Sequence, residues 1–213
     1  MAIARIQVMT SIVGREAGFM KAVADTTVLM NANGLRNVVR VSHSGVPGIE
    51  VWSTTMYKDW KEYGTLTDRM LKDDGMQKQY MSSILDRTGE LLDSFELTEV
   101  PGFEVGIEPT GNLIASTAWR IIPSDGNGGN FLKSCAQAKA LHEKHGARVR
   151  LWSAIGGRYA GAMLYTLGFD NFTSMGKWQE KVKKAQADFM SKQPISAEII
   201  DQIILRPPTA IGA

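Results

Sequence analysis

The side chains in this sequence that could do chemistry are tryptophans and arginines in segments of alternating polarity. Arg40 lies in RNVVRVS and Arg150 in RVRLWSA, which also holds Trp152. Flat aromatic rings beside guanidinium groups suit an aromatic or polyketide-like ligand that bears a carbonyl or carboxylate group. A structural interpretation is also open: the tryptophans fill a core, and the arginines pair with carboxylates or extend to solvent.

We predict a binding site from these segments. The arginines would stabilise an enolate or phenolate, a histidine at a strand end would move a proton, and aromatic and amide groups would hold the substrate. The predicted catalytic residues are His43, Arg40 and Arg150, and the predicted substrate-binding residues are Gln7, Trp52, Trp119, Trp152 and Tyr165. No metal site is predicted.

The remaining candidates have plainer interpretations. His142 and His145 lie in LHEKHG, but no further ligands accompany them and an HExxH motif is absent. A cation at a helix C-terminus explains this pair equally well. His43 is also consistent with an exposed position. Cys135 is the only cysteine, so no intrachain disulfide can form, and it has the character of a small buried hydrophobe.

The elements that must position these residues occur twice. Displacing the chain by 112 positions aligns residues 17–72 with 129–184, and ten of the 56 pairs are identical. Paired glycines fall where the backbone must turn. Gly34 and Gly146 follow helical patterns, and Gly45 and Gly157 lie between alternating runs, as hairpins require. We infer a tandem duplication.

Each copy predicts the order strand, helix, strand, strand, helix, strand. The first copy carries four extra residues near 73–89, which we expect to form a second short helix. The expected elements are 3–10, 16–33, 36–43, 49–55, 57–72 and 90–98 in the first copy, and 113–122, 129–145, 147–155, 159–167, 169–192 and 198–206 in the second.

This order is the ferredoxin-like arrangement. With modules of this length, the chain resembles the dimeric α+β barrel superfamily, which includes antibiotic-biosynthesis-type monooxygenases, haem-degrading enzymes and cyclases. The resemblance implies an α+β fold in which two βαββ(α)β modules face each other as an intrachain pseudo-dimer. The expected units are a first module at 1–98, a linker at 99–112 and a second module at 113–208.

The resemblance also implies that the space between the two sheets holds the site, so strand orientation decides which side chains line it. We expect Ile6, Val8, Val39 and Val41 to face the helices. The side chains expected to point into the barrel are Arg5, Gln7, Met9, Arg40 and Ser42 in the first copy and Thr117, Trp119, Arg150, Trp152 and Tyr165 in the second.

Bulk composition narrows the partners. Of 213 residues, 44% are hydrophobic and 22% charged, as in ordinary globular proteins, and the net charge is only +2. This charge favours neither nucleic acid nor an anionic membrane as a partner. No signal-peptide pattern or membrane-spanning stretch is evident. We therefore expect a cytoplasmic protein.

The leading hypothesis is a small-molecule-binding barrel that acts as a cofactor-independent monooxygenase or related oxidoreductase. The first alternative is a non-catalytic assembly protein, a homo-oligomer joined through sheet edges such as the apolar strand IIDQIIL. The second alternative is haem binding through His43, His142 or His145.

Overall fold

The computed structural model describes residues 1–43, 48–108 and 110–208. The first half of the chain contains three helices and four strands: β1 (Ile3–Ser11), α1 (Glu16–Ala32), β2 (Arg36–Ser42), β3 (Glu50–Tyr57), α2 (Trp60–Lys72), α3 (Asp74–Leu85) and β4 (Gly89–Glu99). The second half repeats the order with one helix fewer: β5 (Leu113–Ile121), α4 (Asn127–Lys144), β6 (Arg148–Ile155), a 3-10 turn η1 (Gly157–Tyr159), β7 (Met163–Phe169), α5 (Phe172–Met190) and β8 (Ala197–Arg206).

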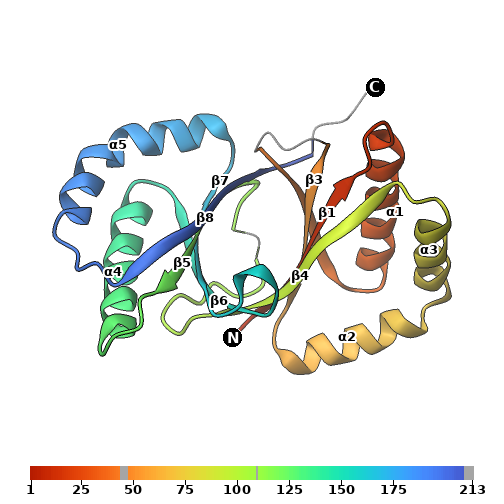
Figure 1. The fold of residues 1–213 in the computed structure, drawn as a ribbon, viewed down its shortest axis with the longest axis horizontal. Coiled ribbons are helices and arrows are strands. Elements are labelled where there is room, and N and C mark those ends of the chain that lie inside the picture. The colour runs from red at the N-terminus through yellow and green to blue at the C-terminus, as the bar shows by residue number, and fades with distance from the viewer. Residues whose placement is uncertain (44–47, 109, 209–213) are drawn as a thin grey trace.

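The strands close into one antiparallel barrel in the order β1-β3-β2-β8-β5-β7-β6-β4, and the helices lie on its outside (Figure 1). Each half supplies four neighbouring strands. The two seams between the halves are short. At one seam β2 pairs with β8 at Val41↔Arg206 and Ser42↔Leu205. At the other, β4 pairs with β6 from Glu96↔Ile155 to Glu99↔Trp152. The fold is therefore the predicted α+β barrel made by a single chain.

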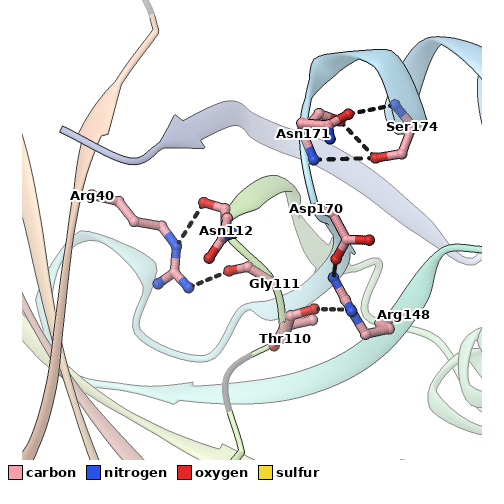
Figure 2. Close-up of polar contacts among 8 residues, drawn as sticks. All are labelled: Arg40, Thr110, Gly111, Asn112, Arg148, Asp170, Asn171 and Ser174. Atoms are coloured by element: carbon pink, nitrogen blue, oxygen red, sulfur yellow. Dashed lines mark hydrogen bonds and ion pairs between the residues drawn. The ribbon is translucent and has the colours of Figure 1, made fainter. Parts of the chain in front are cut away.

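Local sequence explains where the outer helices begin. The Asp59 carboxylate accepts a hydrogen bond from the Glu62 backbone N–H at 2.8 Å and starts α2. Asp73 does the same for α3 through the Met76 N–H at 2.7 Å. Figure 2 shows Asn171 and Ser174 bonded reciprocally at the start of α5. Each cap satisfies backbone donors that the first turn leaves open.

The two halves share a backbone irregularity that supports duplication. The register of β1 against β4 shifts between Val8 and Met9. The register of β5 against β8 shifts between Ala118 and Trp119, at the equivalent place. A β-bulge sharpens the local twist of a strand. The extra residue is Leu92 on β4 in the first half and Ile200 on β8 in the second, so both halves bend their last strand in the same way.

The turns of the two hairpins differ from the expectation or lie outside the described residues. Strand β7 begins at Met163 rather than near 159, because η1 and the turn after it occupy residues 157–161. The predicted turn of the first hairpin, with Gly45, lies outside the described residues. None of the helices within the described ranges is long and apolar enough to cross a membrane.

The barrel interior is an apolar core. Phe95 on β4 is fully buried, and its ring lies 6.1 Å from Trp52 and 5.2 Å from Tyr159, both measured between ring centroids. Tyr159 belongs to η1, so the second half inserts an aromatic ring beside side chains of the first. This cluster joins the two halves.

Replacing Phe95 with alanine is expected to lower the free energy of unfolding by about 3–5 kcal/mol, because the change leaves a cavity where three rings meet. Urea denaturation followed by circular dichroism measures the loss. Leu91→Ala is the control on the same strand, since Leu91 is 59% exposed. Equal stability losses in the two variants would contradict this account of the core.

Candidate ligand-binding site

The larger cavity described here lies outside the barrel, between the sheet of the first half and its helices. It has a volume of about 390 Å³, which is within the usual range for small-molecule sites. Strands β1, β2 and β3 form its floor, and α1, α2 and α3 supply its walls. In Figure 1, three of the elements that supply its lining, β1, α1 and α3, lie at the right.

The floor is polar, which is unusual for a sheet face covered by helices. Its polar members are Arg5, Gln7, Asn37 and Ser53. Asn37 Oδ1 accepts hydrogen bonds from Ser53 Oγ at 2.9 Å and from Thr55 Oγ1 at 3.1 Å. Asn37 Nδ2 lies 3.3 Å from Thr27 Oγ1 on α1. Asn37 and Ser53 therefore satisfy each other.

Arg5 and Gln7 are different, because neither side chain forms a hydrogen bond or ion pair with any residue that the structure describes. The Arg5 Nε atom is buried and has no acceptor there. Gln7 lies two residues further along the same face of β1. Buried polar groups normally have partners, and leaving one unpaired costs about 1–3 kcal/mol. These donors are available to a ligand.

Two tyrosines lie behind Arg5. Burial raises the pKa of Tyr57 to about 12, and the nearby Arg5 charge opposes that shift. Burial also raises the pKa of Tyr63, whose hydroxyl donates to Glu96 Oε1 at 3.1 Å. Both phenols therefore stay protonated near neutral pH. The positive charge of Arg5 consequently remains available to an anionic or electron-rich group in the cavity.

The walls are apolar and rich in methionine. The residues that form them are Met9, Phe19, Val23, Met30, Met70, Met76, Tyr80 and Leu91. Phe19 can lie over the start of β4 because residue 89 is glycine, where an added Cβ would lie 2.4 Å from the Phe19 ring. Flexible thioethers adapt to flat ligands and contact aromatic rings favourably. A polar floor under such walls fits a planar ligand with oxygen substituents on one edge.

In the second half, larger or less polar side chains occupy the positions equivalent to the cavity floor. Counting from the shared bulge, Ala115 stands where Arg5 does and Thr117 where Gln7 does. Trp119 replaces Met9, and Tyr165 replaces Ser53. The aromatic rings pack with Phe131 and Cys135 of α4 into a core.

Four of the predicted site residues lie inside the barrel. Trp52, Trp152, Arg40 and Arg150 line a cavity of only about 70 Å³ between the two sheets. The tryptophans belong to the barrel core. This space is too small for a polycyclic substrate. The tryptophans therefore fill the barrel core.

Gln7, Trp119 and Tyr165 lie on the opposite faces of their strands, so the predicted orientation of β1 and β5 was wrong. Gln7 pairs with Ser53, whereas Trp52 pairs with Val8, which places Gln7 and Trp52 on different sides of the sheet. The more apolar face of β1, with Ile6 and Val8, turns into the barrel. Both faces of β1 are covered. The face toward the helices is the more polar one, and it forms the cavity floor.

His43 lies apart from both cavities. It follows the end of β2, its side chain is exposed, and its ring centroid is 5.3 Å from that of Phe172. Its backbone N–H donates to Ile204 O of β8 at 2.8 Å and extends a seam. Of the predicted residues, only Gln7 reaches the larger cavity. Arg5, which lies beside Gln7 on the cavity floor, was expected in the barrel. The sequence feature that could have indicated this cavity was the length difference between the copies, from which the extra helix α3 was inferred.

No family model matches the sequence, and no curated protein matches it. Solved structures do match in shape. A proposed monooxygenase from Fusobacterium nucleatum has a TM-score of 0.60 at 12% identity, over 96% of this chain and 91% of that one. A proposed chlorite dismutase has a TM-score of 0.57 at 10% identity, over 98% and 95%. An anthrone oxidase-like protein has a TM-score of 0.51 at 11% identity, over 96% and 91%.

The chain has the dimeric α+β barrel fold. At these identities the likeness shows the fold and not the activity. The proposed monooxygenase and the proposed chlorite dismutase match over nearly the whole of both chains, so each of them also holds the two modules in one polypeptide.

The three histidines considered as haem ligands lie away from the larger cavity. None of the residues that line the larger cavity is a histidine. His142 is buried on α4 of the other half, with its ring 5.3 Å from Trp178 and 5.9 Å from Tyr165 between centroids. In the described part of the chain, no three His, Cys, Asp or Glu residues gather as a metal site.

His142 instead makes the barrel sensitive to acid. Burial, with the nearby His145, lowers the pKa of His142 from 6.5 to about 4. The unfolded chain therefore binds one more proton between these values, and stability falls as the pH falls from 6.5 to 4. We expect the melting temperature of His142→Phe to fall less than that of the unmutated protein over this pH range, as measured by differential scanning fluorimetry. His43→Gln, at an exposed histidine outside this cluster, is the control, and identical pH profiles for His142→Phe and the unmutated protein would refute the assignment.

Proposed function

We propose that the cavity between β1 and the helices α1 and α3 binds a planar aromatic or polyketide-like compound with carbonyl, enol or phenol oxygens. The pair of unpaired donors on its floor, Arg5 and Gln7, is the observation that carries this proposal. A carbonyl or enolate oxygen supplies the acceptor that both side chains lack. The methionines and Phe19 would contact the two faces of the ring system.

The proposed activity is a cofactor-independent monooxygenation. A cation beside an enol or phenol oxygen stabilises its deprotonated form, and that electron-rich form transfers electrons to dioxygen. Oxidation of a ring CH₂ group to a carbonyl balances without a reductant, because one oxygen atom enters the product and the other leaves as water. Glu90 lies at the cavity as a carboxylate that can accept the proton, with Arg87 Nη2 at 2.7 Å from its Oε1.

The likeness to an anthrone oxidase-like protein and to a proposed monooxygenase supports this choice of reaction class. The structure adds an independent reason, since the cavity has a charged donor, an amide donor and no histidine among its lining residues. Such a lining stabilises an anion by charge and hydrogen bonds rather than through a metal centre. We therefore favour a substrate whose own ionisation makes it reactive.

Ligand binding should depend on the two floor donors. We expect the double variant Arg5→Met, Gln7→Leu to bind alizarin, a planar hydroxylated anthraquinone, at least about tenfold to a hundredfold more weakly, because the charge-assisted hydrogen bond from Arg5 alone contributes about 1.5–3 kcal/mol. Isothermal titration calorimetry measures the affinity. Thr117→Val, at the equivalent position of the second half, and exposed Arg120→Ala are the controls. Unchanged alizarin affinity in the double variant would exclude this cavity.

Turnover is tested with dithranol, an anthrone that carries an oxidisable ring CH₂ group. We expect the protein to accelerate oxygen uptake, measured with an oxygen electrode, with one O₂ consumed per dithranol oxidised. The double variant at Arg5 and Gln7 should lose this acceleration, and Thr117→Val should keep it. If alizarin binds in the cavity but oxygen uptake equals that of buffer, the binding proposal stands and the monooxygenase proposal falls.

A further inference from the structure

A second cavity, separate from the proposed substrate site, lies inside the barrel and contains two buried arginines. Arg40 on β2 is 4% exposed and Arg150 on β6 is 1% exposed, and both line the space of about 70 Å³ between the sheets. One arginine comes from each half of the chain. Burying a charged group away from water is costly unless an opposite charge or a full set of hydrogen bonds compensates for it.

Within the described part of the chain, the hydrogen bonds of the two guanidinium groups go only to neutral oxygens, and the Arg150 Cζ also lies 5.3 Å from the centroid of the Trp152 ring. Arg40 Nη2 donates to Gly111 O at 2.5 Å, and Arg40 Nε lies 3.4 Å from Asn112 O, as Figure 2 shows. Arg150 Nη2 donates to Glu108 O. Neither arginine has a described carboxylate oxygen within the 4.0 Å of an ion pair. The buried Arg150 Nε has no acceptor among the described residues.

The charges of Glu99 and Glu108 both act favourably on Arg150. Glu108 is exposed, whereas Glu99 is buried at 2% exposed. Its oxygens, however, accept backbone N–H groups of Ala2 at 2.8 Å, Val105 at 2.9 Å and Gly106 at 3.0 Å. Glu99 therefore holds the start of the linker in place.

The surroundings of the arginines increase the need for negative charge. Burial and the charge of Arg150 together lower the pKa of Arg40 to about 10, so Arg40 still carries its charge near neutral pH. The cavity wall also carries the hydroxyls of Ser116 and Thr166, whose oxygens lie 3.2 Å apart. One of these hydroxyls donates to the other, which leaves one hydroxyl hydrogen free for an acceptor.

We propose that this cavity is an anion site, in which Arg40 and Arg150 hold one small oxyanion of nitrate, formate or bicarbonate size between the two sheets. Guanidinium groups match planar oxyanions in geometry and charge. A water needs about 10–15 Å³ of such space, so a cavity of about 70 Å³ admits an anion of a few heavy atoms and excludes larger organic acids.

The anion would also fix the linker. Arg40 and Arg150 bind carbonyl groups at 108, 111 and 112, and a shared anion between them would hold both arginines in this arrangement. Arg148 binds the same linker without lining the cavity. Its Nε donates to Thr110 O at 2.6 Å and its Nη2 lies 2.6 Å from Asp170 (Figure 2), and its side chain is 51% exposed.

The experiment compares melting temperatures while one sodium salt replaces another at constant ionic strength. Gluconate, which is too large for the cavity, is the reference anion, and nitrate and formate are the probes. We expect the melting temperature to rise by several degrees in either probe, in proportion to the logarithm of its concentration above the dissociation constant. Arg148→Ala should keep this response and Arg150→Lys should weaken it. No difference between gluconate and the probes, or equal responses in both variants, would overturn the proposal.

A second measurement does not depend on any variant folding. Crystals of the unmutated protein grown with sodium bromide are expected to show an anomalous scattering peak between the Arg40 and Arg150 guanidinium groups. Bromide peaks at surface lysines only, with none in the barrel, would refute the site. Neither experiment involves alizarin or dithranol, so the anion site can fail while the proposed function stands, and the reverse.

Discussion

The structure depends on the mutual burial of two sheet faces. Each half is a four-stranded sheet with helices on one side, so its other side is apolar and uncovered until the second half packs against it. A face of several hundred Å² contributes on the order of 10 kcal/mol at about 25 cal/mol per Å². The seams at β2–β8 and β4–β6 are short, so side-chain packing inside the barrel, rather than strand pairing, holds the halves together.

The outer faces are free to differ because they do not take part in that packing. Arg5 and Gln7 leave a cavity under α1 and α3, whereas Trp119 and Tyr165 fill the corresponding space under α4. The backbone is shared down to the bulge in the last strand of each half. One half is fully packed, and the other gives up some packing at the proposed binding site, which agrees with the general conflict between stability and function.

The repeat and its glycine positions predicted the fold, the element order and the extra helix α3 from the sequence alone. Orientation was harder. Alternation in IARIQVM shows that two faces differ, but both are buried, and polarity alone assigned Gln7 and Arg5 to the barrel. Cross-strand register decides this, and it is not contained in the pattern of one strand. Arg40 and Arg150 were placed in the barrel correctly, but their bonds to linker carbonyls depend on a loop path without a sequence signature.

The linker that joins Glu99 to Leu113 frees this barrel from a symmetry constraint. In a barrel made of two identical chains, every substitution appears on both sides at once, so a pocket opened in one sheet is opened in the other as well. Here each sheet has its own stretch of sequence and can change independently. Because the halves are covalently joined, dilution does not separate them, and their assembly is a folding event rather than an association between molecules.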